Sequence, residues 1–123
     1  MDDTEFEKLL DRKYAQIVLK VLLDAEDQGY AFSALRDEVN AIVADDSRGT
    51  TELGCEGEYS PASLSSLLSA AQDAGIVSQF LKDGKKRWRL HPSQLSQFQI
   101  NRINAKYSPD GPHADSASYN YYP

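Results

Sequence analysis

The chain has 123 residues, a net charge of −6 and one cysteine, Cys55. This length suits one domain with tails and is too short for two independent enzyme lobes. No apolar run approaches the roughly 18 residues that cross a bilayer, and the acidic start differs from a secretory signal, so we expect a cytoplasmic protein with no membrane partner. A lone cysteine also excludes an internal disulfide framework.

The charges are distributed unevenly along the chain. Residues 1–59 carry 15 acids and 6 bases, whereas residues 60–107 carry 2 acids and 7 bases. The second half is therefore a basic island, and a basic surface attracts a polyanion even when the whole protein is acidic. The excess of acids in residues 1–59 predicts solvated helix faces. A basic partner and a high-salt organism are the alternative explanations for these acids.

A helix is expected at the N-terminus. Thr4 and Glu7 have the spacing of a capping box, and Gly29 marks the end of the helical pattern. Between them runs an apolar stripe of helical period, formed by Phe6, Leu9, Leu10, Ile17, Val18, Val21, Leu22 and Ala25.

A short extended piece at 30–32 should lead into a second helix with Ser33 as its N-cap. The stripe of this helix is Leu35, Val39, Ile42 and Val43. From residue 45 to residue 58 the apolar pattern vanishes among glycines and acids, which predicts a loop. This loop is long for a connection between two helices.

The third helix has clear start and stop signals. Ser60 is its N-cap, Pro61 occupies its first position, where a missing N–H costs nothing, and Gly75 is its C-terminal stop. Its buried side should consist of Leu64, Leu67, Leu68 and Ala71.

A β-hairpin is expected next, because the pair Asp83-Gly84 suits a two-residue type I′ turn. With that turn, Leu81 lies opposite Lys86, and the alternation of side chains sorts the hairpin into two faces. The face directed at the core collects Val77, Leu81, Trp88 and Leu90, and the other is a cationic surface of Ser78, Phe80, Lys82, Lys85, Arg87 and Arg89.

A fourth helix is predicted over residues 93–107. Its apolar residues form two groups at helical spacing, which predict two contacts, one with the domain and one with a second copy in a homodimer. These candidate dimerisation residues are Leu95, Phe98, Ile100, Ile103 and Tyr107. A single irregular buried helix is the alternative. The polar segment 108–123 should be a disordered tail, with a tyrosine docking motif as its alternative role.

The segment 60–90 is similar to the recognition helix and wing of winged helix-turn-helix transcription regulators. Leucines anchor the helix, and the Ala-Gly-Ile-Val sequence at 74–77 turns it into the wing. The order of elements over residues 14–90 fits the same family. The resemblance implies an α+β, mostly helical fold: a domain at 1–91 with three helices and a two-stranded β-hairpin wing, followed by a C-terminal helix at 92–107.

The resemblance implies that helix 60–75 enters the major groove of double-stranded DNA and that wing 76–90 lies on the backbone. The DNA-binding residues would be Ser60, Ala62, Ser63, Ser65, Ser66 and Ser69 on the helix, with Phe80, Lys82, Lys85, Lys86, Arg87 and Arg89 on the wing. This helix differs from a typical recognition helix because it has no Arg or Asn for bidentate base contacts. Its Asp73 would also repel the DNA backbone. Five wing cations predict a salt-dependent affinity.

The function expected from these features is sequence-specific or semi-specific DNA binding by a small transcriptional regulator, associated with the nucleoid. The alternative function is a protein–protein interaction module with the same fold, which would act within a larger assembly without direct DNA binding. The basic wing favours DNA, whereas the serine-rich helix without cations favours a protein partner.

Catalytic and cofactor functions are not expected. The sequence has no Gly-rich phosphate loop, no serine-centred elbow and no His-Glu-x-x-His spacing. Cys55, His91 and His113 lie too far apart in sequence for a zinc site. The acids of the 45–58 loop could hold a divalent cation weakly, but a mobile acidic loop is the commoner meaning.

Overall fold

The computed structural model describes residues 1–44 and 58–107. Within these ranges the chain forms an α+β fold, mostly helical, with five α-helices and one antiparallel hairpin. The elements in chain order are α1 (Asp3–Leu10), α2 (Ala15–Ala25), the 3₁₀ helix η1 (Glu26–Gln28), α3 (Phe32–Ala44), α4 (Pro61–Asp73), β1 (Val77–Lys82), β2 (Lys85–Leu90), the 3₁₀ helix η4 (Pro92–Gln94) and α5 (Gln97–Tyr107). The predicted loop at 45–57 and tail at 108–123 lie outside the described residues, as do Cys55 and His113.

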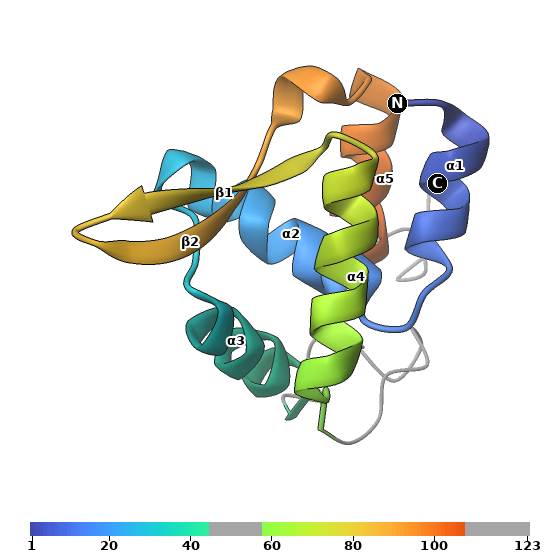
Figure 1. Cartoon of the computed structure of the whole chain (residues 1–123). Coiled ribbons are helices and arrows are strands. Elements are labelled where there is room, and N and C mark those ends of the chain that lie inside the picture. The colour runs from blue at the N-terminus through green and yellow to red at the C-terminus, as the bar shows by residue number, and fades with distance from the viewer. Residues whose placement is uncertain (45–57, 108–123) are drawn as a thin grey trace.

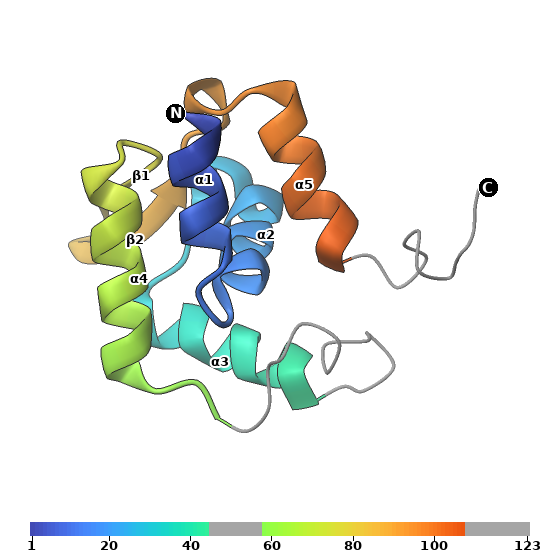
Figure 2. The ribbon, with the colours of Figure 1, turned by 90° about the vertical axis from the view of Figure 1, so that its right-hand side faces the viewer.

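Helix α2 lies at the centre of the fold and contacts α1, α3, α5 and β2. Figure 1 shows α4 in front, with α1 on one side of it and the hairpin on the other. In Figure 2, α4 and α5 lie on opposite sides of α2. A helix covered on several sides must be apolar around most of its circumference. The buried residues of α2 meet this condition, since all but Gln16 are apolar: Ala15, Gln16, Ile17, Val18, Leu19, Val21 and Leu22.

The prediction of one continuous first helix is wrong, because the chain breaks into α1 and α2 at residues 11–14. The N-cap of α1 is Asp2, whose side chain accepts from the backbone N–H of Thr4 at 3.4 Å, so the expected capping box at Thr4 does not form. The charged run 11–13 offers the core no apolar side chain. Tyr14 then turns the chain with a φ of 70°.

Helix α3 begins at Phe32, so Ser33 lies in its first turn and is not the N-cap. Its predicted buried stripe is confirmed. The extended piece before it pairs with β2: the N–H of Tyr30 donates to the carbonyl of Trp88 at 2.8 Å, and the N–H of Trp88 donates back at 2.7 Å. Tyr30 therefore forms an isolated antiparallel bridge to β2, beside the two-stranded hairpin.

The predicted boundaries of α4 agree with the structure. The hydroxyl of Ser60 accepts from the N–H of Ser63 at 3.1 Å, and Pro61 is the first helical residue. Beyond the helix, Gly75 has a φ of 82°. Its N–H donates to Gln72, and the N–H of Ile76 donates to Ala71, which closes the helix end. The leucines predicted to face the core are buried.

The hairpin register is also as predicted, with Leu81 opposite Lys86 and Val77 opposite Leu90. Positive φ values of 54° at Asp83 and 76° at Gly84 fit the type I′ turn.

The C-terminal helix is shorter than predicted. It begins at Gln97, after η4, so Leu95 precedes the helix. Ser96 and Gln99 form a capping box there: the N–H of Gln99 donates to Ser96 Oγ at 3.1 Å, and the N–H of Ser96 donates to Gln99 Oε1 at 2.9 Å. Buried Gln99 also donates to the carbonyl of Met1 and to Asp3, both at 2.8 Å.

Helix α5 is held on the domain by further polar contacts along its length. Gln16 of α2 donates to the carbonyl of Ile103, and the Arg102 guanidinium donates from Nε to the Glu7 carboxylate at 2.9 Å. The hydrogen bond to Glu7 raises the pKa of Arg102. None of the helices in the described part of the chain combines the length and apolarity needed to span a membrane.

We predict that Gly29→Ala destabilises the fold by more than about 3 kcal/mol. Gly29 has a φ of +59°, and a Cβ there would lie 2.2 Å from the carbonyl oxygen of Trp88. Gly84→Ala is the matched control, because Gly84 also has a positive φ but its Cβ would meet nothing within 4 Å. The control should cost only about 1 kcal/mol. Urea unfolding of both variants measures the difference, and equal losses would contradict the close approach.

Candidate nucleic-acid interface

One side of α4 is exposed along the whole helix. It carries all six helix residues that the sequence assigns to DNA contact, and each of them is exposed: Ser60, Ala62, Ser63, Ser65, Ser66 and Ser69. Only uncharged side chains lie on this surface until Asp73 at the C-terminal end, and those before Gln72 are short. A partner surface could therefore approach the helix backbone closely.

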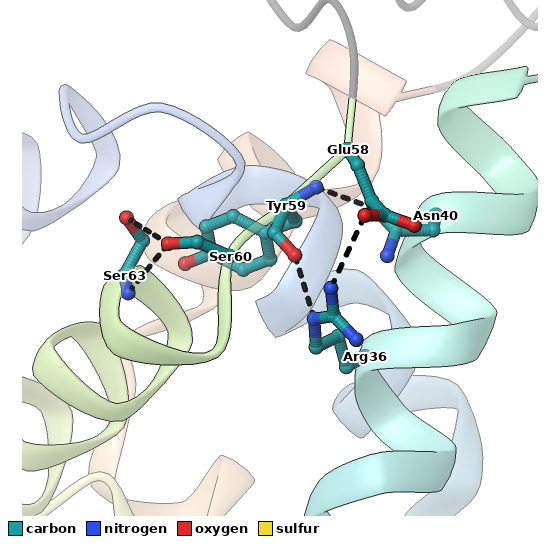
Figure 3. A network of polar contacts seen from close by, with 6 residues as sticks. All are labelled: Arg36, Asn40, Glu58, Tyr59, Ser60 and Ser63. Atoms are coloured by element: carbon teal, nitrogen blue, oxygen red, sulfur yellow. Dashed lines mark hydrogen bonds and ion pairs between the residues drawn. The ribbon is translucent and has the colours of Figure 1, made fainter.

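Helix α3 fixes the entry to α4 (Figure 3). Arg36 Nε donates to the carbonyl of Tyr59 at 2.7 Å, and the N–H of Tyr59 donates to Asn40 Oδ1 at 2.7 Å. Arg36 also pairs with Glu58 at 3.5 Å. Both backbone groups of the residue before the Ser60 cap are thus bound by α3, so α4 starts at a fixed position.

The 11–14 turn packs against Tyr59, the residue that precedes the Ser60 cap of α4. The rings of Tyr14 and Tyr59 stack with centroids 4.2 Å apart and an interplanar angle of 12°. Both tyrosines are buried. Stacking of this kind adds roughly 0.5–1.5 kcal/mol to the burial of the rings. The turn between α1 and α2 is consequently packed against the N-terminal end of α4.

This packing brings two cations to α4 that the sequence analysis did not assign. Arg12 Nη1 donates to Ser66 Oγ at 3.2 Å, and Lys13 lies beside it in the turn. Both cations line a hollow of about 610 Å³ together with Ser60 and Ser63. No local sequence signal places Arg12 near α4, because the contact depends on the packing of distant tyrosines.

The cationic face of the hairpin is partly occupied by contacts within the chain. Arg87 donates from Nε to the carbonyl of Gln28 at 2.8 Å and from Nη2 to the carbonyl of Gly29 at 3.1 Å. Lys82 donates to the side chain of Gln28. Part of this face therefore packs on η1, whereas the sequence predicted a cationic surface along its whole length.

Phe80 and Arg89 belong to the same packed face and are half-buried. The guanidinium carbon of Arg89 lies 5.1 Å from the centroid of the Phe80 ring. Arg89, and not the directly opposite Arg87, is thus the cation on this aromatic ring. Ser78 completes the face through a hydrogen bond of 2.6 Å to His91 Nε2.

The tip of the hairpin is the exposed part. Lys82, Lys85 and Lys86 are exposed there. Leu81 is 70% exposed, so its assignment to the core is wrong. Val77 and Leu90 at the base of the same face are buried, and Trp88 is half-buried against the core. The alternation of side chains predicts the face correctly, but the tip extends past the edge of the core.

The candidate dimerisation residues are mostly used within the chain. Leu95 and Ile103 are buried, at 8% and 0% exposure, and Ile100 packs partly on the core. Phe98 is 57% exposed, and the side chain of Tyr107 lies outside the described residues. The homodimer stays a prediction, with Phe98 as the residue available to it.

No family model, curated protein or solved structure matches this chain. In the described ranges, no three His, Cys, Asp or Glu side chains lie together as metal ligands.

We predict that Asn40→Ala costs about 1–3 kcal/mol, because it leaves the N–H of Tyr59 without its acceptor. Asn101→Ala on α5 is the matched control, since it removes only an exposed hydrogen bond with Gln97. The control should cost less than about 0.5 kcal/mol. Thermal unfolding compares the two, and similar losses would argue against the role of Asn40 in anchoring α4.

Proposed function

We propose that this chain binds double-stranded DNA as a winged helix-turn-helix protein, with α4 in the major groove and the β1–β2 hairpin against the phosphate backbone. The order of α2, the Tyr30 bridge, α3, α4 and the hairpin supports this assignment. In this fold α4 is the recognition helix and the hairpin is the wing.

The observation that carries the proposal is the exposed side of α4 beside a hairpin tip with three exposed lysines, Lys82, Lys85 and Lys86. B-DNA's major groove is about 12 Å wide and admits an α-helix. Serine and alanine side chains add little width to α4, so the helix fits deep in such a groove. Lysines at a projecting tip reach phosphates on the flank of the groove and release counterions.

Recognition by this helix would rest on hydroxyl groups. Serine hydroxyls both donate and accept, so they contact bases or phosphates without the selectivity of a bidentate arginine. The proposed activity is therefore semi-specific binding, with some base readout through bridging water. Such binding suits a small transcriptional regulator.

A protein–protein interaction module is the second candidate. The absence of any cation on the exposed side of α4 favours it, and the exposed Leu81 at the hairpin tip adds an apolar contact point. Such a module would bind its partner without DNA and would retain that binding at high salt.

We predict that Lys85→Gln/Lys86→Gln weakens binding to a labelled pool of mixed-sequence duplexes and lowers the salt slope by about 2, since each phosphate contact contributes roughly 0.9. Lys20→Gln is the control for loss of one charge, because the Lys20 ammonium contacts Asp24 and Asn104 on the side of α5. Each single hairpin variant should lower the slope by about 1, and the control should leave it unchanged. Fluorescence anisotropy at several salt concentrations measures these slopes.

Arg87 is left intact in this experiment because its loss would loosen the hairpin from η1. Absence of binding by the wild type at low salt would refute DNA binding and favour the interaction module. Equal slopes in all variants would remove the hairpin from the interface.

A further inference from the structure

The 11–14 turn supplies the positive charge that α4 itself lacks. Arg12 is held at Ser66 by a hydrogen bond of 3.2 Å from Nη1. Within the described residues this is the one hydrogen bond that the Arg12 guanidinium makes, so its remaining N–H groups can donate to a second ligand. Lys13 is exposed and makes no hydrogen bond or ion pair with the described part of the chain.

The position of these cations is fixed by buried contacts. Tyr14 follows them directly, is buried, and stacks on Tyr59 at 4.2 Å. Tyr59 is in turn bound through both backbone groups by Arg36 and Asn40. A cation held in place loses less entropy on binding than one on a free loop. The turn is consequently preorganised beside the first two turns of α4.

We infer that Arg12 and Lys13 bind phosphodiester groups of duplex DNA on the side of α4 opposite the hairpin, an inference that rests on the proposed function. Arginine offers a planar fork of donors that matches a phosphate, and lysine adds a flexible point charge. The Ser63 hydroxyl, which accepts from Ser60 at 2.9 Å, keeps its own proton to donate in the same hollow.

Acidic groups near the turn leave this contact favourable. Glu58 lines the same hollow, but its carboxylate pairs with Arg36 at 3.5 Å. Asp11 precedes Arg12 in the turn, so residues 11–13 together carry a net charge of +1. The surface that faces the hollow remains cationic.

The two basic elements lie on opposite flanks of one helix. Figure 1 shows α1, which leads into the turn, on one side of α4 and the hairpin on the other. A helix in the major groove lies between two phosphate backbones. The turn would therefore contact one strand and the hairpin tip the other. Contacts with separate phosphates should contribute independently to the affinity.

The test compares the full chain with its Arg12→Gln/Lys13→Gln variant on the same duplex pool, by anisotropy across salt. We expect the salt slope to fall by about 2 and the affinity to fall on the order of tenfold or more near 0.1 M salt. Combining this change with Lys85→Gln/Lys86→Gln should multiply the two losses. Lys13→Arg should keep the wild-type slope, and far-UV circular dichroism checks that each variant is folded.

The outcomes separate this inference from the proposed function. A wild type that binds and a turn variant with the slope of the Lys20→Gln control would overturn the role of the turn while leaving DNA binding in place. A wild type that fails to bind at low salt would overturn both. A loss in the turn variant that Lys13→Arg shares would also count against the inference, because it would mean that packing matters and charge does not.

Discussion

The close approach of Gly29 to Trp88 is the constraint on which the position of the hairpin depends. With no side chain at Gly29, the backbone reaches β2, and Tyr30 exchanges two hydrogen bonds with Trp88. The same approach presents the carbonyls of Gln28 and Gly29 to Arg87. A two-stranded hairpin alone is marginal in water, so these contacts turn a weak ribbon into a fixed part of the fold.

Because of this anchoring, the basic residues of the hairpin fall into two groups: arginines that make contacts within the fold and lysines that are exposed at the tip. The planar guanidinium of Arg87 satisfies two backbone carbonyls at once, and Arg89 lies over Phe80. Both interactions, the paired donation to carbonyls and the stacking on a ring, depend on the planar guanidinium of arginine. Lys85 and Lys86 at the tip keep their charges exposed to solvent. A count of cations in the sequence therefore overstates the charge that the hairpin can offer to a partner.

Local chemistry explains which parts of the fold the sequence predicts well. The Ser60-Pro61 start of α4 and the Asp83-Gly84 turn depend on adjacent residues, so their signals are complete in the sequence. The break at 11–14 depends instead on Tyr14 meeting Tyr59 much later in the chain. The burial of Leu81 was mispredicted for a similar reason. The alternation of side chains along a strand predicts which face a residue lies on, but not how far the core extends along that face.

The candidate interface was predictable to a similar extent. Periodicity identified the exposed side of α4, since its buried leucines leave the serines outside. The position of Arg12 beside α4 escaped prediction because it depends on how α1 and α2 fold back onto α4. The neighbouring sequence of such a residue does not indicate which distant element it will contact.

The arrangement of charge along α4 gives any polyanion bound there a preferred position. Arg12 and Lys13 line a hollow along the N-terminal half of the helix, whereas Asp73 occupies the C-terminal end of the exposed side, where it lines a second hollow that Arg12 also borders. Charges separated by more than the Debye length of about 8–10 Å are screened, so these local groups outweigh the net charge of −6. A duplex would therefore be drawn to the N-terminal half of α4, which is the half that a recognition helix inserts into the major groove.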